Sequence, residues 1–290
     1  MKYNSMAIIV DGKKIASTIL NDLKTRVDAI KSKGGNASLA VVLVGDDKPS
    51  QTYVRKKEEA AKAIGVQFFK LKLSGSISKD ELISEIKKIQ SKEDLTGLIV
   101  QLPLPKHLRD DTREIVNHIE SNIDVDCLNY LSLGKVLMGT NLLLPPTPSA
   151  IMEILKYHDV DLVGKNVVLI GRGNLIGKPL SAMLMHYPVT VTVCGSECHD
   201  LNYFTTKADI IVTGVGKYNI LSGDMVKDGV AVVDAGVCFE NQKMCGDVDF
   251  DSVKEKASVI TPVPGGVGPI TVSKLLENTV IQAENILNNK

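Results

Sequence analysis

Short apolar runs alternate along the chain with stretches whose apolar residues recur at helical spacing. This alternation is typical of an α/β protein with parallel sheets. In the first half the pattern predicts buried strands at Leu39–Val44, Gln67–Leu71 and Gly97–Leu102. In the second half it predicts strands at Asn166–Ile170, Thr190–Val193, Ile210–Thr213, Ala231–Asp234 and Ser258–Thr261. Helical periodicity predicts Ser78–Lys92, Pro148–Tyr157 and Leu180–His186 between them.

The proline-rich segment Leu143–Pro148 marks a predicted connection between two domains. The 290 residues suffice for two domains of about 150 residues each. A last predicted helix, Val272–Asn288, follows a loop rich in glycine and proline, and we expect it to pack back onto the first domain. We therefore expect one domain from residues 1–145 and 273–290, and a second from residues 146–272.

The charge balance narrows the possible partners. The 34 basic and 34 acidic residues give a formal net charge of zero, without a basic stripe. We therefore expect neither nucleic acid nor an anionic membrane surface as a partner. No apolar run approaches the ~18 residues of a membrane span. The N-terminal run Met6–Val10 is too short for the core of a signal peptide.

The five cysteines are odd in number and include no Cys-x-x-Cys pair. This favours a reducing compartment, the cytoplasm, over a disulfide framework. Cys194, Cys198 and His199 lack a second pair of ligands, so we predict no metal site. We interpret the thiols as buried or incidental.

A lysine lies on the apolar face of the helix predicted after Pro49. Ser50 is the expected cap of this helix and Gly65 its expected end. At about 100° per residue, Tyr53 and Lys57 fall on the arc of apolar side chains. The lysine either extends its ammonium group into water or lines a cleft. In a cleft, burial would lower its pKa and suit it to proton exchange near neutral pH, with Tyr53 stacking on a flat substrate.

Two further polar groups stand out after apolar runs. Gln101 lies at the end of a predicted buried strand, where its amide either bonds loop backbone or faces a ligand. Asp124 and Asp126 occupy alternate positions in a predicted turn. They are either solvated acids, or one of them accepts paired N–H groups from a heterocycle.

A glycine-rich turn follows the strand predicted at Asn166–Ile170. Gly171, Gly173 and Gly177 have the spacing G-x-G-x-x-x-G, one residue longer than the usual dinucleotide fingerprint. The turn is either a plain strand-to-helix connection or a pyrophosphate site at a helix N-terminus.

The next predicted strand indicates which dinucleotide would bind. It runs into Gly195 and Ser196, with Glu197 one step later than the acidic residue typical of NAD sites. Because Arg172 lies in the glycine-rich turn, a 2′-phosphate would meet a cation and a hydroxyl group. This favours NADP over NAD. Further along, Pro262–Pro269 contains three glycines and three prolines, which indicates either a rigid turn or close approach of backbone to a ligand.

Together these residues resemble the bifunctional methylenetetrahydrofolate dehydrogenase/methenyltetrahydrofolate cyclohydrolase family. The matching segments follow the family's order over nearly the whole chain. They are Val44–Lys57, Val100–Pro105, Asp124–Asp126, Gly171–Pro179, Asp234–Gly236, Gly246–Val248, Thr261–Pro269 and Glu277–Thr279. The Tyr-x-x-x-Lys helix and the Thr261–Pro269 loop are the most specific.

The resemblance implies two three-layer α/β domains with parallel sheets and an active-site cleft between them. The second would be a Rossmann-like NADP-binding domain, and the protein would be a homodimer. The implied enzyme oxidises 5,10-methylenetetrahydrofolate with NADP and hydrolyses the 5,10-methenyl product to 10-formyltetrahydrofolate. These reactions belong to one-carbon metabolism and purine biosynthesis.

The resemblance also implies roles for individual residues. Lys57 would be the general acid/base, Tyr53 would position the folate, Gln101 would bond Lys57, and Asp126 would bind the pterin ring. Further implied folate contacts are Val100, Leu102, Pro264, Gly265, Gly266, Val267, Gly268 and Pro269. The implied cofactor contacts are Gly171, Arg172, Gly173, Ile176, Gly177, Ser196 and Val237.

Some positions depart from the family pattern. Gly173 stands where serine is usual, Gly195 where histidine is common, and Cys127 where glycine is usual. The first two bear on cofactor preference and the third on the folate pocket beside Asp126. Two alternatives therefore remain: a dehydrogenase with weak cyclohydrolase activity, and a catalytically silent folate- or nucleotide-binding homologue.

Overall fold

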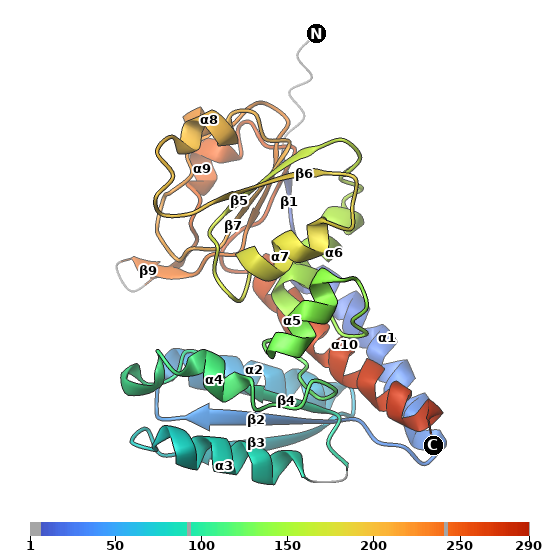
Figure 1. The fold of residues 1–290 in the computed structure, drawn as a ribbon. Helices are drawn as coiled ribbons and strands as arrows, with labels where there is room; N and C mark the ends of the chain where they lie inside the picture. The colour runs from blue at the N-terminus through green and yellow to red at the C-terminus, as the bar shows by residue number, and fades with distance from the viewer. Residues whose placement is uncertain (1–6, 92–93, 241–242, 290) are drawn as a thin grey trace. The chain divides into compact units, whose positions relative to one another are not determined.

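The structure, a computed structural model, describes residues 7–91, 94–240 and 243–289. Its residues group into two compact units, which we name by their main sheets (Figure 1). The three-strand unit comprises residues 17–146 and the chain from Val272 on. The six-strand unit comprises residues 147–271 and the N-terminal segment through Ala16.

Three parallel strands in the order β3-β2-β4 form the sheet of the three-strand unit. The strands are β2 (Ser38–Val44), β3 (Gln67–Leu73) and β4 (Gly97–Val100). The helices are α1 (Gly12–Ser32), α2 (Lys48–Ala63), α3 (Lys79–Gln90), the 3-10 turn η1 (Lys106–Leu108), α4 (Thr112–Val116), α5 (Tyr130–Leu137) and α10 (Val267–Asn288). The unit boundaries at residues 16 and 271 fall inside α1 and α10.

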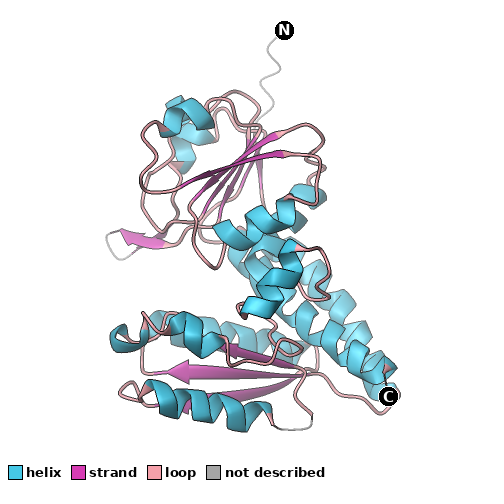
Figure 2. Cartoon of the chain, in the orientation of Figure 1, coloured by secondary structure: helices cyan, strands magenta, loops and turns pink. Residues whose placement is uncertain are grey.

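Alternate residues of β2 enter two separate cores. Helices lie on both faces of the sheet, so this unit has three layers (Figure 2). Leu39 and Val41 pack with apolar side chains of α1, α2 and α10. Ala40 and Val42 pack with those of α3 and β4. The predicted burial of Gln67–Leu71 is wrong, because β3 is an edge strand whose residues are exposed or only partly buried.

The six-strand unit has a parallel sheet in the order β1-β11-β8-β7-β5-β6. The strands are β1 (Ile8–Ile9), β5 (Asn166–Ile170), β6 (Thr190–Cys194), β7 (Ile210–Thr213), β8 (Ala231–Asp234) and β11 (Val259–Ile260). A separate antiparallel pair is formed by β9 (Cys238–Glu240) and β10 (Lys243–Cys245). The helices are α6 (Pro146–Tyr157), α7 (Gly177–Leu184), α8 (Leu201–Thr205), the 3-10 turn η2 (Gly223–Met225) and α9 (Phe250–Val253).

The domain division differs from the expected one at the N-terminus. We expected residues 1–145 in one domain, but β1 pairs in parallel with β11 and places residues 7–16 in the six-strand unit. The other boundaries lie at 146/147 and 271/272, against the expected 145/146 and 272/273. The predicted strands are present, although β6, an edge strand, is mostly not buried. Of the predicted helix Ser78–Lys92, Lys92 lies outside the described residues.

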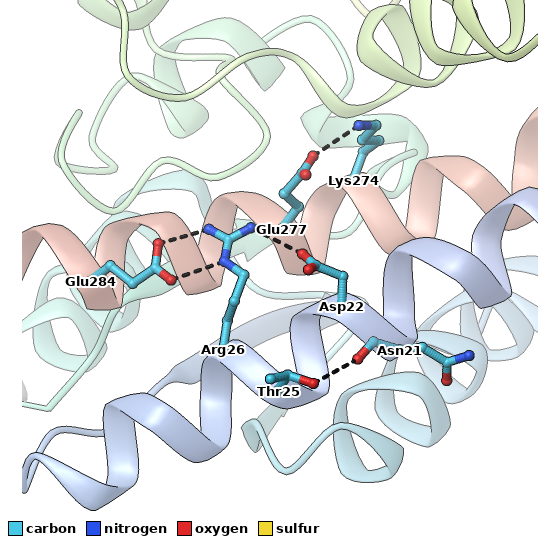
Figure 3. Close-up of polar contacts among 7 residues, drawn as sticks. All are labelled: Asn21, Asp22, Thr25, Arg26, Lys274, Glu277 and Glu284. Atoms are coloured by element: carbon cyan, nitrogen blue, oxygen red, sulfur yellow. Dashed lines mark hydrogen bonds and ion pairs between the residues drawn. The ribbon is translucent and has the colours of Figure 1, made fainter.

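A paired arginine and glutamate join α1 to α10 within the three-strand unit (Figure 3). Arg26 Nε and Nη2 donate to the two carboxylate oxygens of Glu284 at 2.9 and 2.7 Å. Both side chains are only about one-third exposed or less. This geometry is stronger than that of a typical surface ion pair.

We expect Arg26→Met to lower the free energy of unfolding by about 1 kcal/mol, because it removes a bidentate, partly buried pair. Chemical denaturation measures this change. Arg55→Met is the matched control, because Arg55 faces Glu59 at 3.9 Å with both side chains more than half exposed. Equal losses in the two variants would contradict the role given to the Arg26–Glu284 pair.

Candidate functional site

The helix that bears the predicted lysine begins one turn earlier than its sequence suggests. Its cap is Asp47, whose carboxylate accepts the Ser50 backbone N–H at 2.9 Å, so the prediction of Ser50 as the cap is wrong. Ser50 instead donates its hydroxyl to Asp47 at 2.7 Å. The predicted end at Gly65 is confirmed, since α2 stops at Ala63 and Gly65 has a φ of +82°.

Lys57 and Gln101 meet at the carboxyl end of β4 in the three-strand unit. Lys57 comes from α2, and Gln101 follows directly after β4. Lys57 Nζ donates to Gln101 Oε1 at 3.0 Å. Gln101 Nε2 donates to the Leu102 carbonyl at 2.7 Å. Because a carbonyl can only accept, this second bond fixes the amide with its oxygen toward the lysine.

For both Lys57 and Asp126, burial and the charge of the other residue shift the pKa in opposite directions. Lys57 is partly buried, and this burial lowers its pKa, while the attraction of Asp126 raises it. Burial likewise raises the pKa of Asp126, and Lys57 lowers it. Burial also raises the pKa of Tyr53, one turn before Lys57 on α2. The site therefore joins a lysine that loses its proton more readily than usual, a fixed amide, a carboxyl group and a phenol.

Asp124 bonds the backbone of its own turn. Its carboxylate accepts the backbone N–H groups of Leu128 at 3.2 Å and Asn129 at 2.8 Å. It thereby holds the turn that presents Asp126. Within this turn Cys127 has a φ of +54° and is fully buried. A left-handed residue explains why glycine is usual here in the family that the sequence resembles.

We expect Asp124 to make stability fall as the pH rises from about 4 to about 6. Burial raises its pKa from 3.8 to about 6, so in that range the folded state binds more protons than the unfolded state. The full shift corresponds to at most about 3 kcal/mol. Denaturation of wild type and Asp124→Asn at pH 4, 5, 6 and 7 measures the effect. Identical pH slopes for the two proteins would refute it.

The glycine-rich turn lies where the strand order of the six-strand unit reverses. From β5 the sheet continues to β6 on one side and to β7 on the other, which creates the crevice that parallel sheets use for ligands. Gly171 has a φ of +115°, and a Cβ there would lie 2.8 Å from Val215. A Cβ on Gly177, the first residue of α7, would lie 2.1 Å from the Gly171 carbonyl oxygen. Both glycines are thus required by close packing of the turn.

Arg172 borders an open hollow of about 560 Å³ beside the end of β6. Cys194, Gly195, Glu197 and Tyr203 also line it. A Cβ on Gly195 would lie 2.8 Å from Arg172 Nε, so the absent side chain leaves room for the guanidinium group. The departure at Gly195 is therefore coupled to the position of Arg172. A strand-end hollow with a guanidinium group and a glycine cradle fits a dinucleotide that bears an additional phosphate.

The remaining predicted cofactor residues lie in the same unit. Ile176 precedes α7, and Val237 is 44% exposed just before β9. Ser196 donates its hydroxyl to Glu197 at 3.2 Å. A Cβ on Gly173 would meet nothing within 4 Å, so backbone packing does not require glycine there.

The predicted folate residues fall into both units. Val100 is buried in β4, and Leu102 lies beside Gln101 in the three-strand unit. Pro264, Gly265, Gly266, Val267, Gly268 and Pro269 lie in the six-strand unit, at the start of α10. There the Gly12 N–H donates to the Gly265 carbonyl at 3.0 Å, which ties the loop to the start of α1.

Two buried carboxylates organise the loops at the carboxyl ends of the strands in the six-strand unit, a region that we call the cofactor edge. Neither carboxylate had a predicted role. Asp247 accepts the backbone N–H groups of Val215 and Lys217 at 2.7 and 2.8 Å, in the loop after β7. Asp234, at the end of β8, accepts from the Thr213 hydroxyl at 2.9 Å and the Val248 N–H at 3.0 Å. The two acids thus link the chain segments that follow β7, β8 and β10. In the sequence, the available sign of these roles was the pair of nearby glycines, Gly236 and Gly246. A Cβ on Gly236 would collide with the Asp247 carboxylate, and one on Gly246 with the Asp234 carboxylate.

Across residues 7–91, 94–240 and 243–289, no cluster of three or more His, Cys, Asp or Glu side chains could bind a metal ion. In the same part of the chain, no helix has the length and apolar character needed to cross a membrane.

Comparison with known proteins decides the family. Residues 10–126 match the model described as the tetrahydrofolate dehydrogenase/cyclohydrolase catalytic domain, and residues 145–287 match the NAD(P)-binding domain of the same family. The chain belongs to this family. The resemblance inferred from the sequence, and with it the two-domain α/β fold, is confirmed.

Individual members of the family match over almost their full length. The bifunctional protein FolD of Nautilia profundicola is 45% identical over 278 residues, which cover 96% of this chain and 97% of that protein. The FolD crystal structure from Campylobacter jejuni has a TM-score of 0.92 and 41% identity, covering 97% of this chain and 99% of its own. The Trypanosoma brucei enzyme, complexed with NADP and an inhibitor, has a TM-score of 0.92 and 34% identity, with the same coverage.

Proposed function

We propose that this protein oxidises 5,10-methylenetetrahydrofolate to the 5,10-methenyl form with NADP and hydrolyses that product to 10-formyltetrahydrofolate. The bond of 3.0 Å between Lys57 Nζ and Gln101 Oε1 is the observation that carries the proposal. A lysine whose pKa burial lowers, and whose position an amide fixes, is suited to moving a proton between water and a folate nitrogen. Family membership supports both activities.

The hydrolytic step needs proton transfer, and this is the role we assign to Lys57. The uncharged amine accepts a proton from the water that attacks the methenyl carbon. The resulting ammonium donates that proton to the ring nitrogen whose bond to this carbon breaks, and the hydroxyl proton of the adduct leaves to solvent as the formyl group forms. Gln101 is a positioning residue in this step, since its oxygen accepts a hydrogen bond from Lys57. Asp126 binds the pterin ring through its carboxyl group, and Tyr53 supplies a ring and a hydroxyl group to orient the folate.

The oxidative step depends on alignment, because the nitrogen lone pairs of the folate stabilise the carbon that loses hydride. NADP, when bound, accepts that hydride. The backbone close to the pyrophosphate would come from Gly171, Gly173, Ile176 and Gly177. Arg172 and Ser196 would hold the 2′-phosphate, and Val237 would contact the cofactor. Val100 and Leu102 contribute folate contacts from the three-strand unit. The loop Pro264–Pro269 contributes them from the six-strand unit.

The position of Arg172 should depend on the absence of a side chain at residue 195. We expect Gly195→Ala to raise the KM for NADP about fivefold, because its Cβ would displace the guanidinium group. The Gly195→Ala change should add little in an Arg172→Ala background, since the displaced group is then absent. Steady-state kinetics of the single and double variants measure this coupling. Independent, additive effects would contradict it.

One assay tests the proposed function as a whole. Purified enzyme receives 5,10-methylenetetrahydrofolate with NADP or NAD, and both the methenyl and the formyl products are followed. We expect both products, with NADP as the preferred cofactor. Methenyl product without enzyme-accelerated hydrolysis would support a dehydrogenase with weak cyclohydrolase activity. Binding without turnover would support a silent homologue.

We further propose a cytoplasmic homodimer. The cytoplasm suits a chain whose five cysteines are all free thiols. The homodimer is implied by the family resemblance, and β3 supplies an edge strand at which a second copy could associate. Light scattering after size-exclusion chromatography would reveal the dimer as a mass twice that of the 31.3 kDa chain.

A further inference from the structure

Two cysteines that the proposed chemistry does not use face one another on β9 and β10. Cys238 and Cys245 are direct partners in the antiparallel register, so their side chains lie on the same face of the pair. Their Sγ atoms are 2.9 Å apart. Both residues are partly exposed. The interpretation of the cysteines as buried or incidental therefore does not describe this pair.

The pair is continuous with the cofactor edge of the six-strand unit. Cys238 follows Val237, and its thiol also approaches the Gly246 carbonyl oxygen at 3.3 Å. Gly246 in turn precedes Asp247, the carboxylate that holds the loop after β7 through Val215 and Lys217. A change in the bonding of the two sulfurs therefore acts on both chain segments that leave β9 and β10 toward the cofactor.

We propose that Cys238 and Cys245 form a dithiol site that small disulfide compounds oxidise to an intramolecular disulfide, and that this oxidation weakens cofactor binding. The functional part rests on the proposed NADP-dependent activity. Directly opposed cysteines of an antiparallel pair meet the Cα spacing that a disulfide requires. A bond length of about 2.05 Å requires the sulfurs to approach by a further ~0.9 Å.

The reaction is a two-step thiol–disulfide exchange. The Cys245 thiolate attacks one sulfur of the small disulfide, forms a mixed disulfide and expels one thiolate. The Cys238 thiolate then attacks Cys245 Sγ, forms the internal bond and expels the second thiolate. The protein loses two protons and two electrons, and the small disulfide gains them to become two thiols. Burial, followed by the contact with Cys245, raises the pKa of Cys238. The same exchange balances with the two cysteines in exchanged roles.

Closure of the disulfide has a direct structural effect. It removes the Cys238 thiol hydrogen that faces the Gly246 carbonyl, and it draws the end of β10 toward the start of β9. Val237 and Asp247 flank these positions. We therefore expect oxidation to raise the KM for NADP at least threefold. Lys57 and Gln101 lie in the other unit, so methenyltetrahydrofolate hydrolysis should be unchanged.

Glutathione disulfide is the probe for the chemical part of the proposal. Treated wild-type enzyme should lose 2 Da, and peptide mapping should find Cys238 linked to Cys245. Neither Cys238→Ser nor Cys245→Ser should lose 2 Da, and the cysteine that remains in each variant should retain glutathione as a mixed disulfide. A linkage between Cys194 and Cys198 alone, or free thiols at 238 and 245, would overturn the proposal without bearing on the proposed function.

The functional part is measured on the same samples. Reduced and oxidised wild type are compared for NADP KM and for hydrolysis, before and after dithiothreitol. The expected result is a reversible rise in KM in wild type and no change in Cys245→Ser. A disulfide that leaves KM unaltered would overturn the coupling to the cofactor. Lack of dehydrogenase activity in the reduced enzyme would instead refute the proposed function.

Discussion

Lys57→Met should lower the rate of methenyltetrahydrofolate hydrolysis at least 100-fold, because it removes the group that moves the proton. Oxidation of methylenetetrahydrofolate should fall much less, since that step depends on alignment. The measurement follows each reaction separately with purified enzyme. Lys62→Met is the matched control, because Lys62 lies on the same helix but is mostly exposed and pairs with Glu58. Near-wild-type hydrolysis by Lys57→Met would eliminate the assignment.

Gln101→Glu separates a chemical role of Lys57 from a structural one. A carboxylate 3.0 Å from the ammonium group would favour the charged lysine and raise its pKa. The pH midpoint that reports Lys57 in the hydrolysis profile should therefore move to higher pH. An unaltered midpoint in a folded variant would show that the lysine does not titrate in the reaction.

Arg172→Ala should raise the KM for NADP at least tenfold, which corresponds to about 1.4 kcal/mol of lost binding free energy. The guanidinium group makes charge-assisted hydrogen bonds to a phosphate, and alanine cannot replace them. The KM for NAD, which lacks that phosphate, should change less than threefold. Lys165→Ala is the control for general loss of positive charge, because Lys165 directly precedes β5 and so lies at the opposite end of that strand from the glycine-rich turn.

The comparison between the two cofactors decides this prediction. Equal increases in KM for NADP and NAD would remove the 2′-phosphate from the role of Arg172. The residue would then act on the shared part of the dinucleotide, beside the glycine-rich turn.

Much of the fold could be predicted because apolar runs mark buried strands. Asn166–Ile170, Ile210–Thr213 and Ala231–Asp234 agree residue by residue with β5, β7 and β8. Other strands were missed or misjudged. β1 lies in the apolar run Met6–Val10, but its two residues are exposed and it pairs with β11, about 250 residues later in the chain. Edge position, which no local pattern reveals, accounts for the exposure of β3.

The candidate site shows the same limit. Helical spacing was enough to single out Lys57, because its neighbours on the arc, such as Val54 and Ala61, are buried. Its contact with Gln101 joins positions 44 residues apart and follows from the packing of α2 against the sheet. The relation between Arg172 and Gly195 likewise joins two different strand ends. Such pairings require the tertiary structure, and the roles assigned to these residues remain predictions for the experiments above.

The pairing of β1 with β11 has a consequence for synthesis of the chain on the ribosome. Ile8 and Ile9 emerge first, but their partners Val259 and Ile260 follow about 250 residues later. At 5–20 residues per second, this delay lasts between about 12 and 50 s. The three-strand unit waits as well, because α10 ends at Asn288. Neither unit can therefore be completed while the segment Val259–Asn288 is still inside the ribosome.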